Sequence, residues 1–120
     1  MLKPALLVLT AMADGDTRLT LSYAESAEEC EAKRAVVTQI LTEAGMAPLR
    51  TLCGETELQL TPYEHGAAPT AETHRYRVEI PSVGGFAITP LAEGDDCAPA
   101  PDADPAIYCT RSGQQETGGS

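Results

Sequence analysis

Four cysteines constrain most strongly what this chain can fold into. Cys30 and Cys53 flank a predicted helix-to-strand unit, and Cys97 and Cys109 flank one short segment. An even number of cysteines in a short chain favours a disulfide framework. The arrangement predicts two local bonds, Cys30–Cys53 and Cys97–Cys109, although four cysteines permit three pairings. Disulfides persist in oxidising compartments, so we expect a periplasmic or secreted protein.

The composition predicts one small domain whose core depends on these bonds. The chain has 120 residues and a hydrophobic content of 42%, but only 4% of its residues are aromatic. A core of Leu, Val, Ile and Ala buries less area per residue than an aromatic core does. Each disulfide should contribute about 3 kcal/mol in the chain-entropy model, and both together rival the stability of a small domain. We therefore expect both bonds to be structural.

The charge excludes several classes of function. Eighteen acidic residues against eight basic ones give a net charge of −10. This sign excludes a nucleic-acid binder, which must neutralise phosphates, and disfavours adhesion to anionic lipid. No apolar run approaches the roughly 20 residues that span a bilayer, so we expect no direct membrane insertion. An acidic surface favours solubility or docking on a basic surface of another protein.

The N-terminal segment predicts a β-hairpin. Residues 5–12 (ALLVLTAM) and 17–23 (TRLTLSY) are β-prone, and the Asp14-Gly15 pair between them is typical of a hairpin turn. A basic start, an apolar stretch and Ala11-Met12-Ala13 also imitate a short secretory signal. Cleavage there would leave the second strand without its partner. We therefore favour the hairpin.

A capped amphipathic helix follows the hairpin. Ser26 and Glu29 have the spacing of a capping box, and Gly45 followed by Pro48 predicts the helix end. The spacing of the apolar residues predicts one buried helix face. That face comprises Cys30, Val37, Ile40, Leu41 and Ala44. We expect it to pack across a sheet, with Cys30 facing the strand that contains Cys53.

Three further strands are predicted over residues 49–61, 76–80 and 86–91, with Pro90 indicating either a sheet edge or the end of pairing for the last strand. The resulting β-β-α-β-β-β order predicts an α+β fold, a mainly antiparallel sheet with one helix packed on one face. We expect the opposite sheet face to have too few apolar residues to be both exposed and well packed, unless loops or a partner cover it. Residues 93–106 form an acidic loop rich in Pro and Ala. The predicted domain covers residues 1–111, and 112–120 are expected to be a flexible tail.

Two clusters are weak candidates for metal binding. His65 and His74 lie beside Glu64 and Glu72, but without the one-turn spacing of H-E-x-x-H. Four aspartates crowd into one loop and suggest calcium, yet their spacing does not match an EF-hand. They are Asp95, Asp96, Asp102 and Asp104. The cysteine separations of 23, 44 and 12 residues do not fit a zinc site. We expect no metal and no cofactor.

Catalytic signatures are missing from the sequence. It contains neither a C-x-x-C pair nor a G-x-S-x-G elbow, so we predict a protein that is not an enzyme. Several aromatic residues fall at strand ends or loop margins, where they favour contact with a partner. The candidate contact residues are Tyr63, Tyr76, Phe86 and Tyr108.

These observations predict a non-catalytic periplasmic or secreted protein-binding module. We expect it to act as an accessory subunit that docks on an envelope membrane-protein complex with a basic extracytoplasmic surface. One alternative is a secreted enzyme inhibitor that inserts its disulfide-bonded 97–109 loop into an enzyme. A less favoured alternative is a small metal-dependent enzyme that uses His65 and His74.

Overall fold

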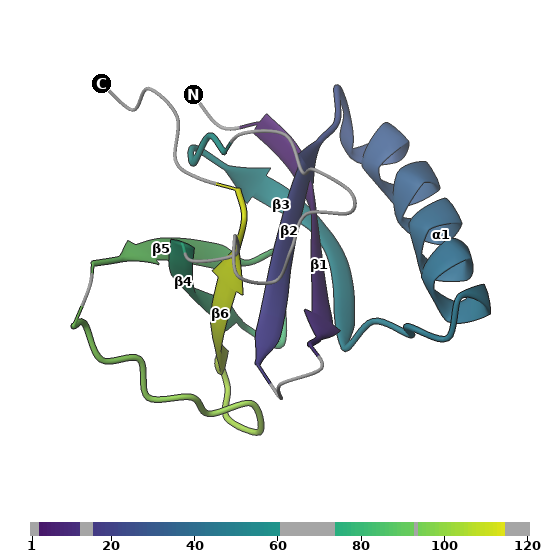
Figure 1. The fold of residues 1–120 in the computed structure, drawn as a ribbon. Coiled ribbons are helices and arrows are strands. Elements are labelled where there is room, and N and C mark those ends of the chain that lie inside the picture. Colours follow the sequence, from purple (N-terminus) through teal and green to yellow (C-terminus); the bar gives the residue numbers. More distant parts are fainter. Residues whose placement is uncertain (1–2, 13–15, 61–73, 93, 115–120) are drawn as a thin grey trace.

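A computed structural model of the chain describes residues 3–12, 16–60, 74–92 and 94–114. It shows one helix and a six-stranded, mostly antiparallel sheet, which confirms the α+β prediction (Figure 1). In chain order the elements are β1 (Lys3–Ala11), β2 (Thr17–Tyr23), α1 (Ala27–Glu43), β3 (Arg50–Thr56), β4 (His74–Ile80), β5 (Ala87–Leu91) and β6 (Ala106–Ser112).

The sheet consists of two antiparallel halves joined by one short parallel contact. Its strand order is β3-β1-β2-β6-β4-β5. Strand β1 pairs with both β2 and β3, and β4 pairs with both β5 and β6, all antiparallel. Between the halves, β2 and β6 are parallel over only two residue pairs, Thr17–Thr110 and Arg18–Arg111. Strand β5 is a sheet edge, which is one of the two alternatives that Pro90 indicated.

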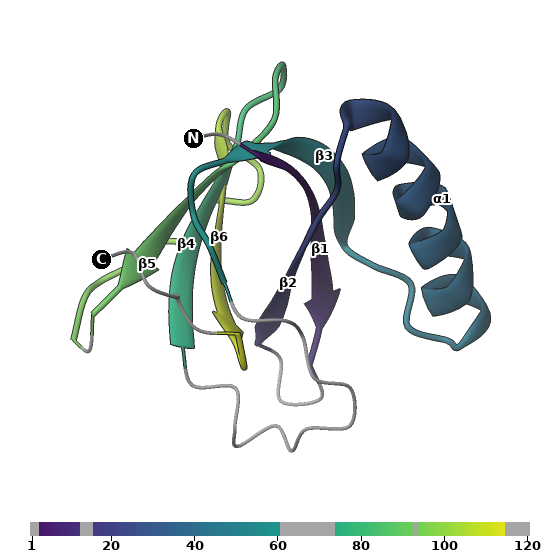
Figure 2. The same ribbon diagram turned by 90° about the horizontal axis from the view of Figure 1, so that it is seen from above.

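The main core lies on the face of the sheet away from the helix. Figure 2 shows the strands as an arch, with α1 outside it against β1 and β3. Within the arch, side chains from both halves form one buried cluster that includes Leu7, Leu21 and Val78. A smaller cluster under α1 contains Leu6, Val8 and Cys30. The expectation that the face opposite the helix has too few apolar residues to be well packed is therefore wrong, because the curved sheet encloses that face.

Both ends of helix α1 have the capping residues that the sequence predicts. Ser26 is the N-cap, and its hydroxyl accepts a hydrogen bond from Glu29 N at 3.1 Å. After the C-cap at Ala44, Gly45 has a φ of +77°, a backbone conformation that glycine adopts without strain. Local sequence signals thus account for both ends of the helix.

The buried face of α1 is narrower than predicted. Val37 and Leu41 pack on the cluster around Cys30, but Ile40 is 57% exposed and Ala44 is also exposed. Ile40 lies about 100° around the helix from Leu41. Because α1 packs mainly on β1 and β3, that side of the helix is left uncovered, and the assignment of Ile40 and Ala44 to the buried face is wrong.

Two strand predictions also need correction. The strand predicted over 49–61 ends at Thr56, because the next residues leave the ladder and Leu58 packs on the core. The Tyr23 hydroxyl donates to Leu58 O at 2.5 Å and accepts from Leu60 N at 2.9 Å, replacing strand partners there. Strand β6 was absent from the prediction, because the Pro-rich loop before it obscured its short β-prone segment.

The chain remains part of the fold beyond the predicted domain boundary. Residue 111 lies inside β6, which ends at Ser112. Gln114 is 1% exposed and its side chain bonds to the backbone of Leu21. The remainder of the predicted tail, residues 115–120, lies outside the described residues.

Candidate functional site

The described aromatic residues predicted as partner contacts differ in burial, and one of them is a core residue. Tyr76 is 2% exposed and its hydroxyl donates to Gln114 O at 2.7 Å. It is a core residue, because β4 is flanked on both sides and turns this side chain into the arch. Tyr108 and Phe86 are half-buried against the same core. Tyr63 lies outside the described residues.

Two of the four aspartates in the 95–104 segment accept hydrogen bonds from nearby protein groups. The Asp95 carboxylate accepts from Ala92 N at 2.7 Å. Asp104 accepts from both the backbone N and the hydroxyl of Ser82, at 3.0 and 2.9 Å. Asp96 and Asp102 are exposed. Within the described residues, no three His, Cys, Asp or Glu side chains converge on a position suitable for a metal ion.

The histidine cluster can be placed only in part. His74 is the first residue of β4 and is half-buried. His65, Glu64 and Glu72 lie outside the described residues. The metal-dependent alternative therefore stays a prediction.

Both predicted disulfides are present. Cys30–Cys53 links α1 to β3, and Cys97–Cys109 links the acidic loop to β6. No cysteine is free. The first bond holds the helix beside the edge of the sheet, and a hollow lies between α1 and β3.

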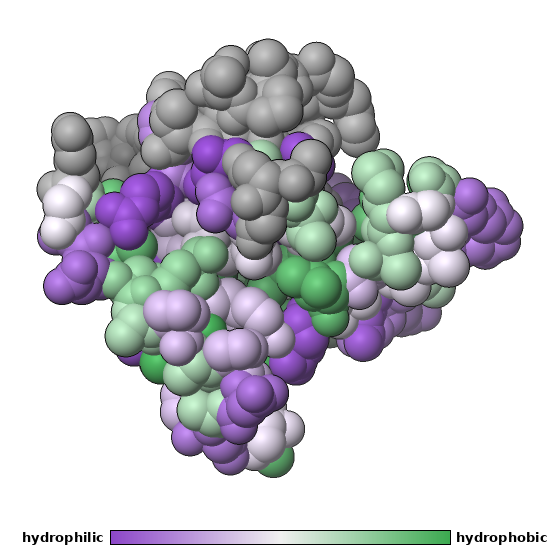
Figure 3. All heavy atoms as spheres, turned by 60° about the horizontal axis from the view of Figure 1, so that its bottom comes forward, coloured by the Kyte–Doolittle hydropathy of each residue, from purple (hydrophilic) through white to green (hydrophobic). Residues whose placement is uncertain are grey.

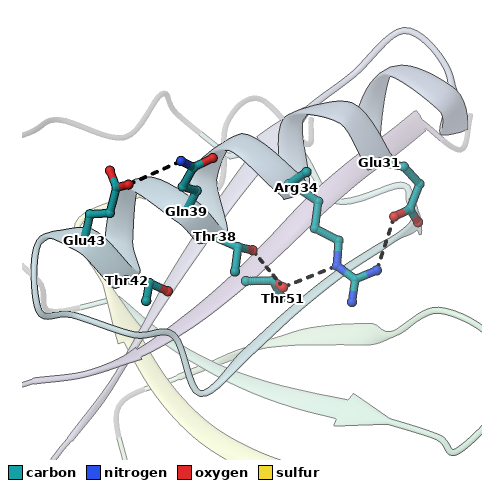
Figure 4. A pocket seen from close by; sticks show the side chains of 8 residues that line it. Glu31, Arg34, Thr38, Gln39, Thr42, Glu43 and Thr51 are labelled. Atoms are coloured by element: carbon teal, nitrogen blue, oxygen red, sulfur yellow. Dashed lines mark hydrogen bonds and ion pairs between the residues drawn. The ribbon is translucent and has the colours of Figure 1, made fainter.

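That hollow is a groove of about 660 Å³ between α1 and β3. Thr51 of β3 lies at its centre, where its hydroxyl accepts from Arg34 Nε and Thr38 Oγ1, both at 3.3 Å (Figure 4). Arg34 also pairs with Glu31 at 3.2 Å. The full lining is Glu31, Arg34, Ala35, Thr38, Gln39, Thr42, Glu43 and Thr51. We call this hollow the α1–β3 groove.

Strand β3 presents a sheet edge to this groove. Among the described residues it pairs only with β1. Residues of an antiparallel strand direct their backbone N–H and C=O groups alternately toward one neighbour and the other. The hydrogen bonds of β1 therefore reveal which groups of β3 face outward.

Two carbonyls of β1 settle this alternation. Pro4 O accepts from Ala24 N at 2.9 Å, beyond the end of β2, so Pro4 faces away from its β3 partner Glu55. At the other end, Leu9 O faces β3 and accepts from Leu49 N at 2.7 Å. Alternate β3 residues starting from Glu55 therefore direct both backbone groups away from β1. These residues are Thr51, Cys53 and Glu55.

A second hollow, of about 460 Å³, lies beside the far end of β3. It lies between the end of β3 and the start of β5, and its lining is Glu55, Thr56, Glu57, Leu58, Phe86, Ala87 and Ile88. The two edges of the curved sheet approach each other here. A Cβ placed on Gly54 would lie 2.9 Å from the Phe86 ring and 3.2 Å from Gly85 Cα.

Carboxylates and hydroxyls are the main polar groups that line these two hollows. Four carboxylates and one guanidinium line them, from Glu31, Glu43, Glu55, Glu57 and Arg34. Among the described residues, the hydroxyl groups in these linings belong to threonines. Hydroxyls, carboxylates and an open strand edge offer hydrogen bonds to a polar or peptide ligand.

Several large apolar side chains are exposed elsewhere. They are Val36, Ile40, Met46, Leu49 and Val83, at 48–86% exposure. On the face shown in Figure 3, hydrophobic residues gather between the helix and the sheet, with hydrophilic residues around them. These exposed residues belong to three segments: α1, the α1–β3 connection and the β4–β5 turn. We assign no specific ligand to these exposed apolar side chains.

Sequence patterns did not indicate the α1–β3 groove. Arg34, Thr38 and Thr51 carry no motif, and their meeting depends on the side of β3 over which α1 packs. The one useful signal was the Cys30–Cys53 pairing, which places that helix against that strand.

Comparison with protein-family models, with curated proteins and with solved structures found no match to this chain. The described part of the chain has no helix long and apolar enough to cross a membrane. Functional inference therefore rests on the groove, the β3 edge, the charge and the disulfides.

Proposed function

We propose that this protein is a non-catalytic binding module of the periplasm or the extracellular space. It docks on another protein as an accessory subunit of an envelope membrane-protein complex. One observation carries the proposal: Thr51, Cys53 and Glu55 direct backbone groups outward along a sheet edge, beside the α1–β3 groove. An edge of this kind is a ready template for pairing with another chain.

Two other properties support the proposal. Both disulfides are formed, as is typical of proteins in oxidising compartments. The net charge of −10 favours a partner with a basic surface, whose attraction speeds association.

Native envelope extraction tests this function. The tagged protein is released in mild detergent and separated by size. We expect it to migrate with a larger assembly, whose components mass spectrometry then identifies. Thr38→Arg, which places a long cation in the α1–β3 groove, should abolish co-migration. The control is Val36→Arg, which adds the same charge on the exposed outer side of α1 and should not change migration. Migration of the unmodified protein as a free species would contradict the proposal.

One observation favours the inhibitor alternative. Residues 101–105 are all exposed, within the loop closed by Cys97–Cys109. A constrained loop loses less conformational entropy on binding. If the protein migrates as a free species and captures a secreted enzyme, the double variant Cys97→Ala/Cys109→Ala should weaken that capture. An accessory subunit that binds through β3 should keep its partner in this variant, provided that the variant remains folded.

A further inference from the structure

We infer that the partner binds through an extended, lysine- or arginine-containing segment that adds to the sheet as a strand beside β3. This inference rests on the proposed function and specifies what the α1–β3 groove receives. It follows from the orientation of the β3 backbone, the shape of the groove and the charge of its lining.

The backbone of β3 supplies the first argument. Three alternate residues direct both N–H and C=O away from β1, which is the pattern that a neighbouring strand requires. The contact of Gly85 and Phe86 with Gly54 limits access at the far end of the strand. The accessible edge begins at Thr51, beside the groove. A short strand is therefore the matching ligand, because its main-chain hydrogen bonds would supply affinity.

The groove supplies the second argument. An added strand would lie next to Thr51, with α1 forming a wall on one side (Figure 4). Successive side chains of a strand point to opposite faces, so every second ligand residue would face this wall. Thr38 and Thr42 contribute short side chains there, and a volume of about 660 Å³ accommodates several ligand side chains.

The charge of the lining supplies the third argument. Four carboxylates surround the β3 edge: Glu31 and Glu43 line the groove, and Glu55 and Glu57 line the second hollow beyond the Gly54 contact. Arg34 is the one cation among them, and Glu31 pairs with it. The excess of negative charge around the β3 edge selects a basic segment and disfavours an acidic one.

Peptide titration of the full-length, disulfide-bonded protein tests the inference. The probe is a capped six-residue peptide of alternating Lys and Thr. Its binding is measured by NMR of the protein's backbone amides. Two versions of the probe are N-methylated, one at every Lys and one at every Thr. Methylation keeps the charge but removes the amide hydrogens of one strand edge. A fourth peptide has Glu in place of Lys.

We expect the unmethylated basic peptide to protect the amides of Thr51 and Cys53 from hydrogen exchange, because the Gly54 contact limits access beyond them. One methylated version should bind at least about tenfold more weakly than the other, since only one edge of the ligand pairs with β3. The Glu peptide should also bind at least about tenfold more weakly. Equal affinities of the two methylated peptides, or unprotected β3 amides, would overturn strand addition.

A matched pair of variants provides an independent measurement. Thr51→Pro and Thr51→Val both remove the hydroxyl that binds Arg34 and Thr38. Only proline also removes the outward N–H and so blocks the added strand, at a position where an edge strand tolerates it. Peptide binding should fall about tenfold further in Thr51→Pro than in Thr51→Val. Circular dichroism establishes that both variants are folded; if proline unfolds the protein, the methylated peptides decide.

The outcomes separate this inference from the proposed function. Suppose that the protein co-migrates with an envelope assembly, that Thr38→Arg abolishes this co-migration, and that no peptide binds at β3. This result would support the proposed function and overturn strand addition. Loss of both results would overturn both proposals.

Discussion

The side-chain amide of Gln114 is hydrogen-bonded to both backbone groups of Leu21. Leu21 N donates to Gln114 Oε1, and Gln114 Nε2 donates to Leu21 O, each at 2.9 Å. These two bonds extend the short parallel contact of β2 and β6. The side-chain amide takes the place of the backbone groups that a further β6 residue would offer to β2. The hydroxyl of Tyr76, on β4 in the half of the sheet that does not contain Leu21, donates to the backbone carbonyl of Gln114. Gln114 therefore joins the two halves at the point where strand pairing ends.

Gln114→Ala should destabilise the fold substantially. The substitution leaves the N–H and C=O of Leu21 without these partners in a buried position, at a cost of about 2–5 kcal/mol. Urea unfolding measures the loss. The control is Gln39→Ala on α1, whose exposed amide bonds only to Glu43 and whose loss should cost less than about 0.5 kcal/mol. Similar losses in both variants would show that Gln114 does not join the halves.

Tyr23 should make the fold sensitive to alkaline pH. Partial burial raises the pKa of its hydroxyl above 10.0, and the hydrogen bond from Leu60 N opposes this effect. The folded state therefore favours the neutral phenol, whereas the unfolded chain loses that proton near pH 10. The contribution of Tyr23 to the free energy of unfolding is complete below about pH 10, and it is lost as pH rises through the pKa of Tyr23 in the folded protein.

Tyr23→Phe provides the comparison. It should cost about 1–3 kcal/mol at neutral pH, because Leu58 O and Leu60 N lose their partner. The difference in unfolding free energy between the two proteins should then shrink between pH 9 and pH 12. A difference that stays constant over this range would contradict the assignment.

Gly54→Ala should disturb the contact between the two sheet edges. Gly54 lies opposite Ala5 in the ladder, and an added Cβ would meet the Phe86 ring at 2.9 Å. We expect a loss of about 1–3 kcal/mol from overpacking. The cost should be smaller in a Phe86→Leu background, which leaves more room. A double-mutant cycle measures this coupling, and additive effects would show that the ring is not what excludes the methyl group.

Removing either disulfide should lower stability by a comparable amount. The bonds close segments of 23 and 12 residues, so the chain-entropy model gives about 3 kcal/mol for each, slightly more for Cys30–Cys53. Cys30→Ala/Cys53→Ala and Cys97→Ala/Cys109→Ala are compared by thermal unfolding. Thiol titration of the native protein should detect no reactive cysteine. Reactive thiols there would remove the argument for an oxidising compartment.

Two neighbouring residues of α1 test how narrow its buried face is. Leu41→Ala should cost about 2–3 kcal/mol, because Leu41 packs on the Cys30 cluster. Ile40→Ala should cost less than about 1 kcal/mol, because Ile40 is 57% exposed. Urea unfolding compares the two variants. Equal losses would place Ile40 in the core after all.

Local signals in the sequence determined the parts of the fold that depend on neighbouring residues. The alternation of Leu19 and Leu21 identified β2, and Ser26 and Gly45 marked the ends of α1. The cysteine spacing indicated both disulfides correctly, because short chain separations favour bonds between nearby elements. Each of these features arises from interactions within a few residues or across a short loop.

Only the tertiary structure decided the strand order, and with it the candidate site. The parallel neighbours β2 and β6 are far apart in the chain, and the position of β3 at the sheet edge follows from that order. The same order exposes Ile40, buries Tyr76 and brings Arg34 to Thr51. Such placements depend on how whole strands and one helix bury their apolar faces together. That free energy is shared among distant residues and leaves no periodic or spaced motif along the chain.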